Sequence, residues 1–325
     1  NVTVESITAW AERDPDGFAA RYGAEALTEG PRKMQTLVDA FWNVGLHLAL
    51  AKNVVLEKGI LIRYELASEG AAMLTRLHVE AATSSQGCVV EHYTSPDDTR
   101  TLFAEHRECY VDANANMKVI SVQEWGDKGV HLGEDWARVR RDAVVNLVTM
   151  SLGGRTSKMM VGCDMCEPNS SAYLGGLYFA HDKQLFDQKT LQRHSSPDTY
   201  SNMLYKGAAK DEGHSVYQGF IQATPGAIRV DSYQTNNNLL LTPGARADSI
   251  PGLIIDADDL ACSHGATMGN LDPDEIYYLR ARGIPEKLAR KMLVLGFFEE
   301  VVERVPQTLL QDRLHEVIER KFGEV

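Results

Sequence analysis

The sequence predicts a mainly β protein with helical segments at both ends. Through most of the chain, apolar residues alternate with polar ones at a period of two, the spacing of a strand that buries one face. Before about residue 45 and after about residue 269, the apolar residues recur every three or four positions, as they do along a helix. We therefore expect a helical segment over 1–45, a β region over 46–268 and a helical domain over 269–325.

Short helices are expected in the N-terminal segment. Met34, Leu37, Val38 and Phe41 repeat at intervals of three and four residues, which places them on one helical face. From about Leu46 the period changes to two.

Strands are expected throughout the middle region. Ile60, Ile62 and Tyr64 alternate with mostly polar neighbours, and the same alternation recurs as far as Val122. Turn residues separate the alternating stretches, and no long amphipathic helix lies between them. This pattern argues against a parallel sheet built from helical crossovers and leaves an all-β region.

A short internal echo favours a solenoid within this β region. Residues 224–227 read Thr-Pro-Gly-Ala, and 242–245 repeat them at an offset of 18 residues (242 minus 224), close to one coil of a β-helical solenoid. A simple pair of similar turns explains the echo equally well. The asparagine run at 236–238 suits either a stacked polar corner or an exposed turn.

Three helices are expected after residue 269. Asp272 can cap the first helix, Pro273 fits its first turn and Gly283 ends it. Pro285 then opens a second helix, and a third is expected over about 307–321.

The charge balance disfavours several classes of partner. The chain has 33 basic and 45 acidic side chains, and its net charge of -12 repels phosphate backbones and anionic lipid headgroups. No apolar run approaches the roughly 20 residues that a membrane-spanning helix needs. The five cysteines are an odd number, which argues against a full disulfide framework. We therefore expect a cytoplasmic protein that binds neither nucleic acid nor membrane.

The common catalytic motifs do not occur in the sequence. It contains no P-loop, no dinucleotide-binding fingerprint, no G-x-S-x-G elbow and no H-E-x-x-H zinc motif. The chain is therefore not expected to be an enzyme.

Cys262 and His264 are the candidate metal ligands. On an extended backbone, residues two apart point to the same side, so the thiol and the imidazole project together. Both are suited to iron or zinc. Two ligands cannot complete a four-coordinate site, so any metal or cluster here would be shared with a partner and transient.

The second C-terminal helix is predicted to be apolar over more than one face. Phe297 and Phe298 follow Leu293 by about one turn, so either another helix of the same domain covers this surface or a partner docks on it. Arg280 on the preceding helix either stays solvated or pairs with an acidic patch of such a partner. These four residues, with Tyr278, are the candidate partner-binding residues.

Three stretches of the chain carry a resemblance to a known family. Residues 233–241 (Tyr-Gln-Thr-Asn-Asn-Asn-Leu-Leu-Leu), 262–267 (Cys-Ser-His-Gly-Ala-Thr) and 276–284 (Ile-Tyr-Tyr-Leu-Arg-Ala-Arg-Gly-Ile) follow one another in an order that resembles SufD. That family supplies a scaffold subunit of the Suf machinery, which assembles iron-sulfur clusters. The resemblance implies a right-handed parallel β-helix with helical segments at both ends.

The resemblance also implies assembly rather than catalysis. SufD pairs with its paralogue SufB through the β-helix, and its C-terminal helices, here residues 272–322, bind the ATPase SufC. A homodimer is the candidate state when SufB is missing. Cys262 and His264 match the interface positions, with His264 ranked first, so a transient iron-sulfur cluster is expected at the shared interface and none on this chain alone.

A SufB-type paralogue is the nearest alternative. SufB-like chains carry a different block where this chain has residues 262–267, with a glutamate ahead of the alanine, and a cysteine near 236–238. This sequence has neither, which favours SufD.

Two alternatives come from other classes of protein. A β-helical enzyme acting on polysaccharide would need paired carboxylates, for which Asp256 and Asp258 share a strand face. A self-sufficient metal protein would combine Cys163 and Cys166 with the Cys-x-His pair. Side chains three apart on a strand face opposite ways, however, so these two thiols would need a bulge to converge.

Overall fold

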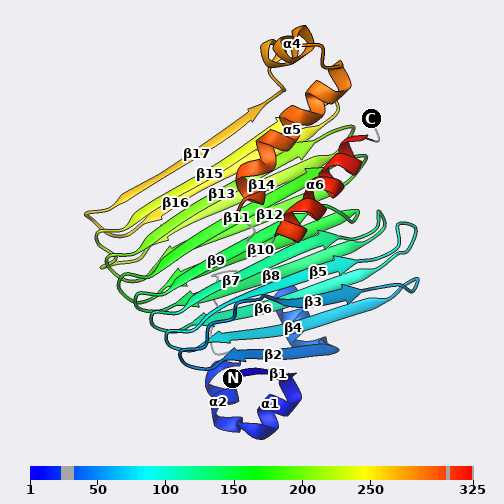
Figure 1. Ribbon diagram of the computed structural model, residues 1–325. Coiled ribbons are helices and arrows are strands. Elements are labelled where there is room, and N and C mark those ends of the chain that lie inside the picture. Colours follow the sequence, from blue (N-terminus) through cyan, green and yellow to red (C-terminus); the bar gives the residue numbers. More distant parts are fainter. Residues whose placement is uncertain (23–32, 305–307, 324–325) are drawn as a thin grey trace.

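The computed structural model describes residues 1–22, 33–304 and 308–323, and this part of the chain winds into a parallel β-helix (Figure 1). Successive strands alternate between two sheets, one of nine strands in the order β1-β2-β4-β6-β8-β10-β12-β14-β16 and one of eight in the order β3-β5-β7-β9-β11-β13-β15-β17. The sixteen strands from β2 to β17 therefore make eight coils of two strands each. The predicted fold class, a mainly β parallel β-helix with helical segments at both ends, is confirmed.

The strands of the nine-stranded sheet are β1 (Val2–Ser6), β2 (Val44–Leu50), β4 (Ala72–Ala81), β6 (Leu102–Val111), β8 (Val130–Val139), β10 (Thr156–Met165), β12 (Leu185–His194), β14 (His214–Ala223) and β16 (Arg246–Ile255). Those of the eight-stranded sheet are β3 (Ile60–Glu65), β5 (Gln86–Thr94), β7 (Asn116–Glu124), β9 (Val144–Ser151), β11 (Ser171–Ala180), β13 (Tyr200–Ala209), β15 (Asp231–Leu240) and β17 (Ala261–Gly269).

In each coil, one non-glycine residue of the turn that leads from the nine-stranded sheet to the eight-stranded sheet adopts a left-handed backbone conformation. These residues are Asn53, Ser84, Asn114, Asp142, Asn169, Asp198, Arg229 and Asp259. Asparagine and aspartate, which tolerate this conformation best among side-chain-bearing residues, hold most of these positions.

The turn positions give the true coil length, which ranges from 27 residues (169 minus 142) to 31 (84 minus 53). The 18-residue echo is therefore not one coil, and the solenoid interpretation of it is wrong. Its copies at 224–227 and 242–245 are the turns before and after β15, which makes them a pair of similar turns.

The interior of the β-helix contains charged side chains as well as an aliphatic core. Arg107 donates hydrogen bonds to the carboxylates of Glu91 and Asp135 and, at 2.8 Å, to the hydroxyl of Ser121. All four residues are buried. A charge is tolerated in such a place only when it is paired and hydrogen-bonded, so these contacts link the second, third and fourth coils.

The N-terminal segment closes the first coil. β1 pairs antiparallel with β2, and the helices α1 (Ile7–Arg13), α2 (Pro15–Arg21) and α3 (Lys33–Phe41) follow. Ser6 caps α1 by accepting a hydrogen bond from the backbone N–H of Ala9 at 3.1 Å. Trp10 stacks on His47 of β2 with ring centroids 3.9 Å apart, which fixes α1 against the sheet. Part of the expected helical segment, residues 23–32, lies outside the described residues.

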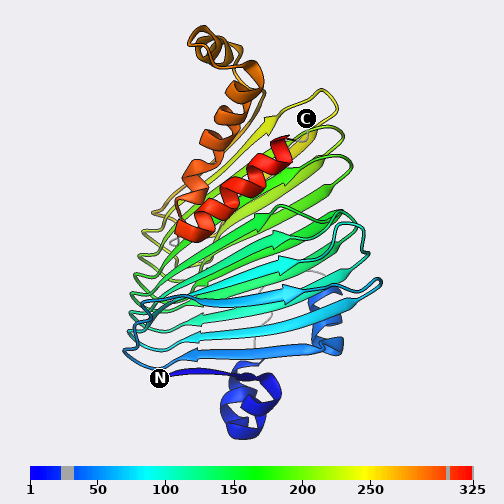
Figure 2. The ribbon, with the colours of Figure 1, turned by 45° about the vertical axis from the view of Figure 1, so that its right-hand side comes forward.

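The C-terminal helices are α4 (Pro273–Ala281), α5 (Glu286–Val302) and α6 (Thr308–Gly323). Asp272 caps α4 as predicted, because its carboxylate accepts from the N–H of Asp274 at 2.8 Å, and Gly283 after the helix has a φ of +86°. α5 and α6 lie across the outer face of the eight-stranded sheet, whereas α4 projects beyond β17 (Figure 2).

Candidate functional site

The last coil of the β-helix is open. β16 and β17 are the terminal strands of the two sheets, and within the described residues each has a neighbouring strand on one side only. Large apolar side chains of this coil, including Ile250, Ile254 and Met268, are exposed. An edge strand offers unpaired N–H and C=O groups to any chain that can add a further strand. The open end is therefore a surface on which another chain can continue the sheets.

Both candidate metal ligands lie on β17 at this open end. In the strand register, Cys262 lies beside Ser232 of β15 and His264 lies beside Gln234. Ser232 and Gln234 are buried in the interior, so Cys262 and His264 occupy the interior-facing positions of the last coil. They share one face of the strand, and because no described strand lies beyond β17, His264 is exposed.

The thiol of Cys262 is half-buried. It packs beside Ala223, Ala227 and Val230 at the end of the interior. Burial, together with the negative charge of Asp231, raises the pKa of the Cys262 thiol to about 11. The Cys262 thiol of the isolated chain is therefore protonated at neutral pH, and because the thiolate is the form that binds metals, a metal at this position would have to displace the proton.

A layer of hydrogen-bonded polar side chains lies in the interior next to the open end. Asn236 accepts hydrogen bonds from Asn238 at 2.8 Å and from Ser249 at 2.7 Å. Asn237 points to the outer face, where it accepts from Thr267 at 2.8 Å. The asparagine run therefore belongs to β15 and is neither a stacked corner nor an exposed turn. Asparagine side chains are tolerated in this interior strand because their amide groups find hydrogen-bond partners there.

The cysteines do not form a common metal site in the described residues, which contain no group of three or more His, Cys, Asp or Glu side chains able to hold a metal ion. Cys163 is buried in the interior on β10. Cys166 follows the end of β10, where its thiol donates to the carbonyl of Val139 at 3.2 Å. The proposed set of four ligands is thus not assembled, because β10 and β17 belong to different coils and different sheets.

Asp256 and Asp258 do not share a strand face. β16 ends at Ile255 and β17 begins at Ala261, so both carboxylates lie in the exposed turn between the strands. The apolar residues that end β16 made the acidic run resemble a strand, but the left-handed residue Asp259 turns the chain there. The paired carboxylates of a sugar-cleaving groove are not formed by these residues.

The candidate partner-binding residues lie at different depths. Tyr278 and Arg280 of α4 are exposed, Leu293 and Phe297 of α5 are half-buried, and Phe298 is fully buried. The ring of Phe298 packs on Phe179 of β11, with centroids 6.2 Å apart. Phe298 therefore anchors α5 to the sheet in this structure.

The helices also expose apolar side chains other than the five candidate partner-binding residues. Tyr277 of α4, with 72% of its surface accessible, and Leu288 and Met292 of α5 are exposed. Leu288 and Met292 lie one turn apart on one helical face. Their spacing of four residues places them on one helical face and could have indicated a shared surface. Because α5 has apolar residues on more than one face, however, the sequence does not reveal which of them the sheet covers.

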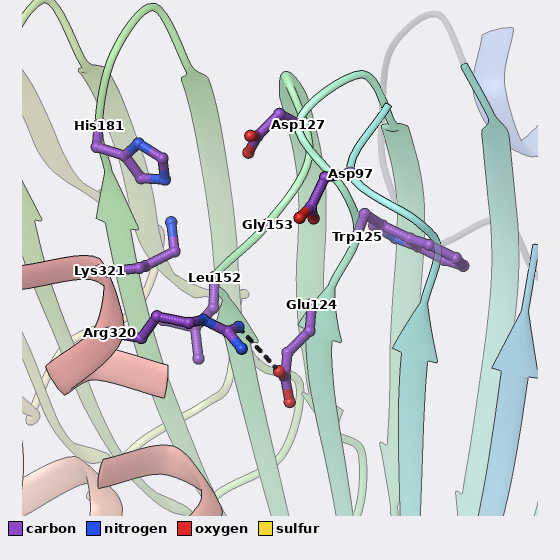
Figure 3. Close-up of a pocket in the computed structure, with 9 residues that line it drawn as sticks. All are labelled: Asp97, Glu124, Trp125, Asp127, Leu152, Gly153, His181, Arg320 and Lys321. Atoms are coloured by element: carbon purple, nitrogen blue, oxygen red, sulfur yellow. Dashed lines mark ion pairs between the residues drawn. The ribbon is translucent and has the colours of Figure 1, made fainter. Parts of the chain in front are cut away.

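A polar cavity of about 170 Å³ lies where α6 meets the turns of the β-helix (Figure 3). Arg320 of α6 points toward Glu124 at the end of β7, and Asp97 and Asp127 of the turns also line the cavity. Glu124 pairs with Arg320 at 3.6 Å and accepts from Arg313 at 2.8 Å. Hydrogen bonds from His92 and Arg313 lower the pKa of Glu124, although burial, the largest single influence, opposes them. The cavity thus lies beside the ion pairs that hold α6 on the β-helix.

Comparison with known proteins gives a consistent result. Residues 64–297 match the family described as SUF system FeS cluster assembly, SufBD core domain. An iron-sulfur cluster assembly SufBD family protein of Mycobacterium tuberculosis is 35% identical over 262 residues, which cover 78% of this chain and 65% of that protein. The iron-sulfur cluster assembly protein SufD of Escherichia coli is 31% identical over 228 residues, or 70% of this chain and 54% of that protein.

A more distant relative, a SufBD family protein of Staphylococcus saprophyticus, is 24% identical over 91% of this chain and 64% of its own length. The chain thus spans between 54% and 65% of the length of these three curated relatives. No described helix is long and apolar enough to cross a membrane. The family match covers far more than half of the sequence and runs from the third strand into α5, and on that ground the chain belongs to the SufBD family of iron-sulfur cluster assembly proteins.

Proposed function

We propose that this chain is a SufD-type scaffold subunit without catalytic activity of its own. In this proposal it pairs with a SufB-type paralogue through the open end of the β-helix and binds a SufC-type ATPase through its C-terminal helices. The observation that carries the proposal is the position of Cys262 and His264 on an edge strand that pairs with β15 on one side and has no partner on the other among the described residues. The similarity to Escherichia coli SufD favours the SufD type over the SufB type.

The cluster at this interface would be cargo, held for a short time. Cys262 and His264 supply one sulfur and one nitrogen ligand, which is half of a four-coordinate iron site. The described residues bring no further cysteine, histidine or carboxylate to make a group of three. The remaining ligands must then come from the partner subunit or from sulfide, so the site exists only while the two subunits are joined.

The exposed part of the C-terminal helices would bind the ATPase. Tyr277 on α4 and Leu288 and Met292 on α5 are large exposed apolar side chains, which favours docking of a protein partner. Arg280 pairs with Glu286 at 3.3 Å in the free chain and can exchange this exposed partner for an acidic group of the ATPase.

A cytoplasmic location is part of this proposal. All five cysteines are free thiols, which suits a reducing compartment. When the SufB-type partner is missing, the same edge strands can pair with a second copy of the chain, so a homodimer is expected.

Co-expression tests the assembly. The chain is produced with SufB-type and SufC-type proteins and analysed by size-exclusion chromatography with light scattering. We expect a stable complex of all three proteins, and a homodimer when the chain is produced alone. A chain that elutes by itself in the presence of both proteins would refute the scaffold role.

Anaerobic reconstitution of the complex with iron and sulfide tests the ligands. We expect Cys262→Ala and His264→Ala to lower the bound iron and acid-labile sulfide, with the larger loss for His264→Ala. Ser263→Ala is the matched control, because Ser263 is exposed on the opposite face of the same strand. Equal cluster content in all three variants would remove Cys262 and His264 from the site.

A further inference from the structure

We propose that Gln234 is a positioning residue for His264. In this arrangement the side-chain oxygen of Gln234 accepts a hydrogen bond from Nδ1–H of the imidazole, which leaves Nε2 free to bind a metal at the open end. The inference rests on the proposed function of His264 as an interface ligand and adds the residue that sets its tautomer and direction.

The position of Gln234 follows from the strand register. Gln234 lies directly beside His264 in the β15–β17 ladder, on the interior face, and is 0% exposed. Adjacent strands are about 4.8 Å apart, so the two side chains are stacked neighbours. Among the described residues, β17 is the last strand of its sheet, so His264 is the only side chain that lies between Gln234 and the open end at this register position.

The orientation of the Gln234 amide is fixed by its other hydrogen bond. Nε2 donates to the carbonyl of Gly219 at 3.2 Å, and a carbonyl can accept only from the nitrogen end of the amide. Oε1 therefore points away from Gly219. It is a buried acceptor with no hydrogen-bond partner among the described residues, and such an atom costs free energy comparable to a lost hydrogen bond.

The neighbouring donors are already engaged. The Asn236 amide donates to the hydroxyl of Tyr178 at 3.0 Å and to the carbonyl of Tyr205 at 3.2 Å. The hydroxyl of Ser232 bonds to that of Ser201 at 2.7 Å. The side chain directly beside Gln234 in the β15–β17 ladder is the imidazole of His264, which is exposed and carries an N–H that can donate.

The chemical consequence is a defined histidine tautomer. A neutral imidazole carries one proton, and the acceptor that takes it decides which nitrogen is left as the metal ligand. With Nδ1–H bound to a buried amide oxygen, Nε2 faces outward toward the partner. Second-shell acceptors of this kind typically contribute 10–100-fold to metal affinity.

The test reads the tautomer directly, without a metal. The full chain is labelled with 15N-histidine, and long-range 1H–15N spectra are recorded at about pH 8.5, above the usual histidine pKa of about 6.5. His264→Gln identifies the signals of His264. We expect the Nδ1–H form in the wild type, loss of that preference in Gln234→Leu, and its retention in Gln234→Glu, which keeps an acceptor.

Gln188→Leu is the matched control. Gln188 is also a buried interior glutamine, but it lies on β12 and donates to Ser151 at 3.1 Å, remote from β17. The Gln188→Leu variant should change the thermal stability about as much as Gln234→Leu does, while leaving the His264 signals unchanged. The same His264 tautomer in the wild type and Gln234→Leu would overturn the inference.

Co²⁺ titration of the complex with the SufB-type partner separates this inference from the proposed function. We expect a 10–100-fold weaker affinity in Gln234→Leu and no change in Gln188→Leu. If His264→Ala binds Co²⁺ as tightly as the wild type, the proposed ligand role fails and the inference fails with it. If His264→Ala weakens binding but Gln234→Leu does not, only the positioning role is overturned.

Discussion

Replacement of Arg107 by methionine should strongly destabilise the β-helix. Arg107 is 2% exposed and is the shared hydrogen-bond donor to Glu91 and Asp135, which are themselves fully buried. Methionine keeps much of the volume of the side chain but removes the charge and every donor. Glu91 then remains in the interior without its counter-charge. Removing one member of a buried pair costs about 3–5 kcal/mol, because an uncompensated charge is left behind.

Urea unfolding followed by far-UV circular dichroism measures this loss. The matched control is Arg100→Met, because Arg100 also contacts a carboxylate, that of Glu69 at 2.5 Å, but its side chain is 78% exposed. Water and salt replace such a surface partner, so little change is expected there. A loss below about 1 kcal/mol in Arg107→Met, or one no larger than in the control, would refute the reasoning from buried charge. Adding Glu91→Gln to Arg107→Met should restore part of the stability.

The remaining predictions concern the open end and the helices. The Cys262 thiol, with its pKa raised to about 11, should be alkylated slowly at about pH 8 and much faster toward pH 11, as followed by mass spectrometry; full modification at the lower pH would contradict the burial argument. Ile254→Lys on the β16 edge should weaken pairing with a second copy or with the partner in light-scattering measurements, whereas Leu61→Lys, at an exposed site remote from the open end, should not. Phe298→Ala should destabilise the C-terminal helices by about 3–5 kcal/mol, as judged by thermal unfolding. Met292→Lys should instead reduce ATPase capture in a pull-down without lowering the unfolding temperature; the reverse pattern would show that the assigned surface and core of α5 are exchanged.

The pattern of the sequence predicts the elements better than it predicts how they stack. Period-two alternation locates the strands because each strand has an interior face and an exterior face. Asp272, Pro273 and Gly283 locate α4 because capping is a local property of the backbone. The coil length is not predicted, because each coil closes with a different turn sequence. Only the left-handed turn position, occupied for example by Asn114 or Asp142, recurs from coil to coil, and different residue types occupy it.

The sequence predicts only part of the candidate site. The spacing of Cys262 and His264 predicts their common face, since it depends on one strand alone. Gln234 could not be connected to His264 in this way, because their proximity comes from pairing between strands 30 residues apart (264 minus 234). The burial of Phe298 and the exposure of Met292 likewise depend on how α5 lies on β11 and β13.

The two ends of the β-helix differ in a way that links stability to assembly. A solenoid needs a cover at each end, because an uncovered coil exposes apolar side chains and unpaired strand edges. At the first coil the chain provides its own cover, with β1 paired along β2 and Trp10 stacked on the sheet. At the last coil the described residues provide none, and Met268 lies in the open on the same strand as His264. A partner that covers this end would therefore bury the apolar edge and enclose the two candidate ligands in one step, so that the proposed metal site would form through the same contacts that hold the subunits together.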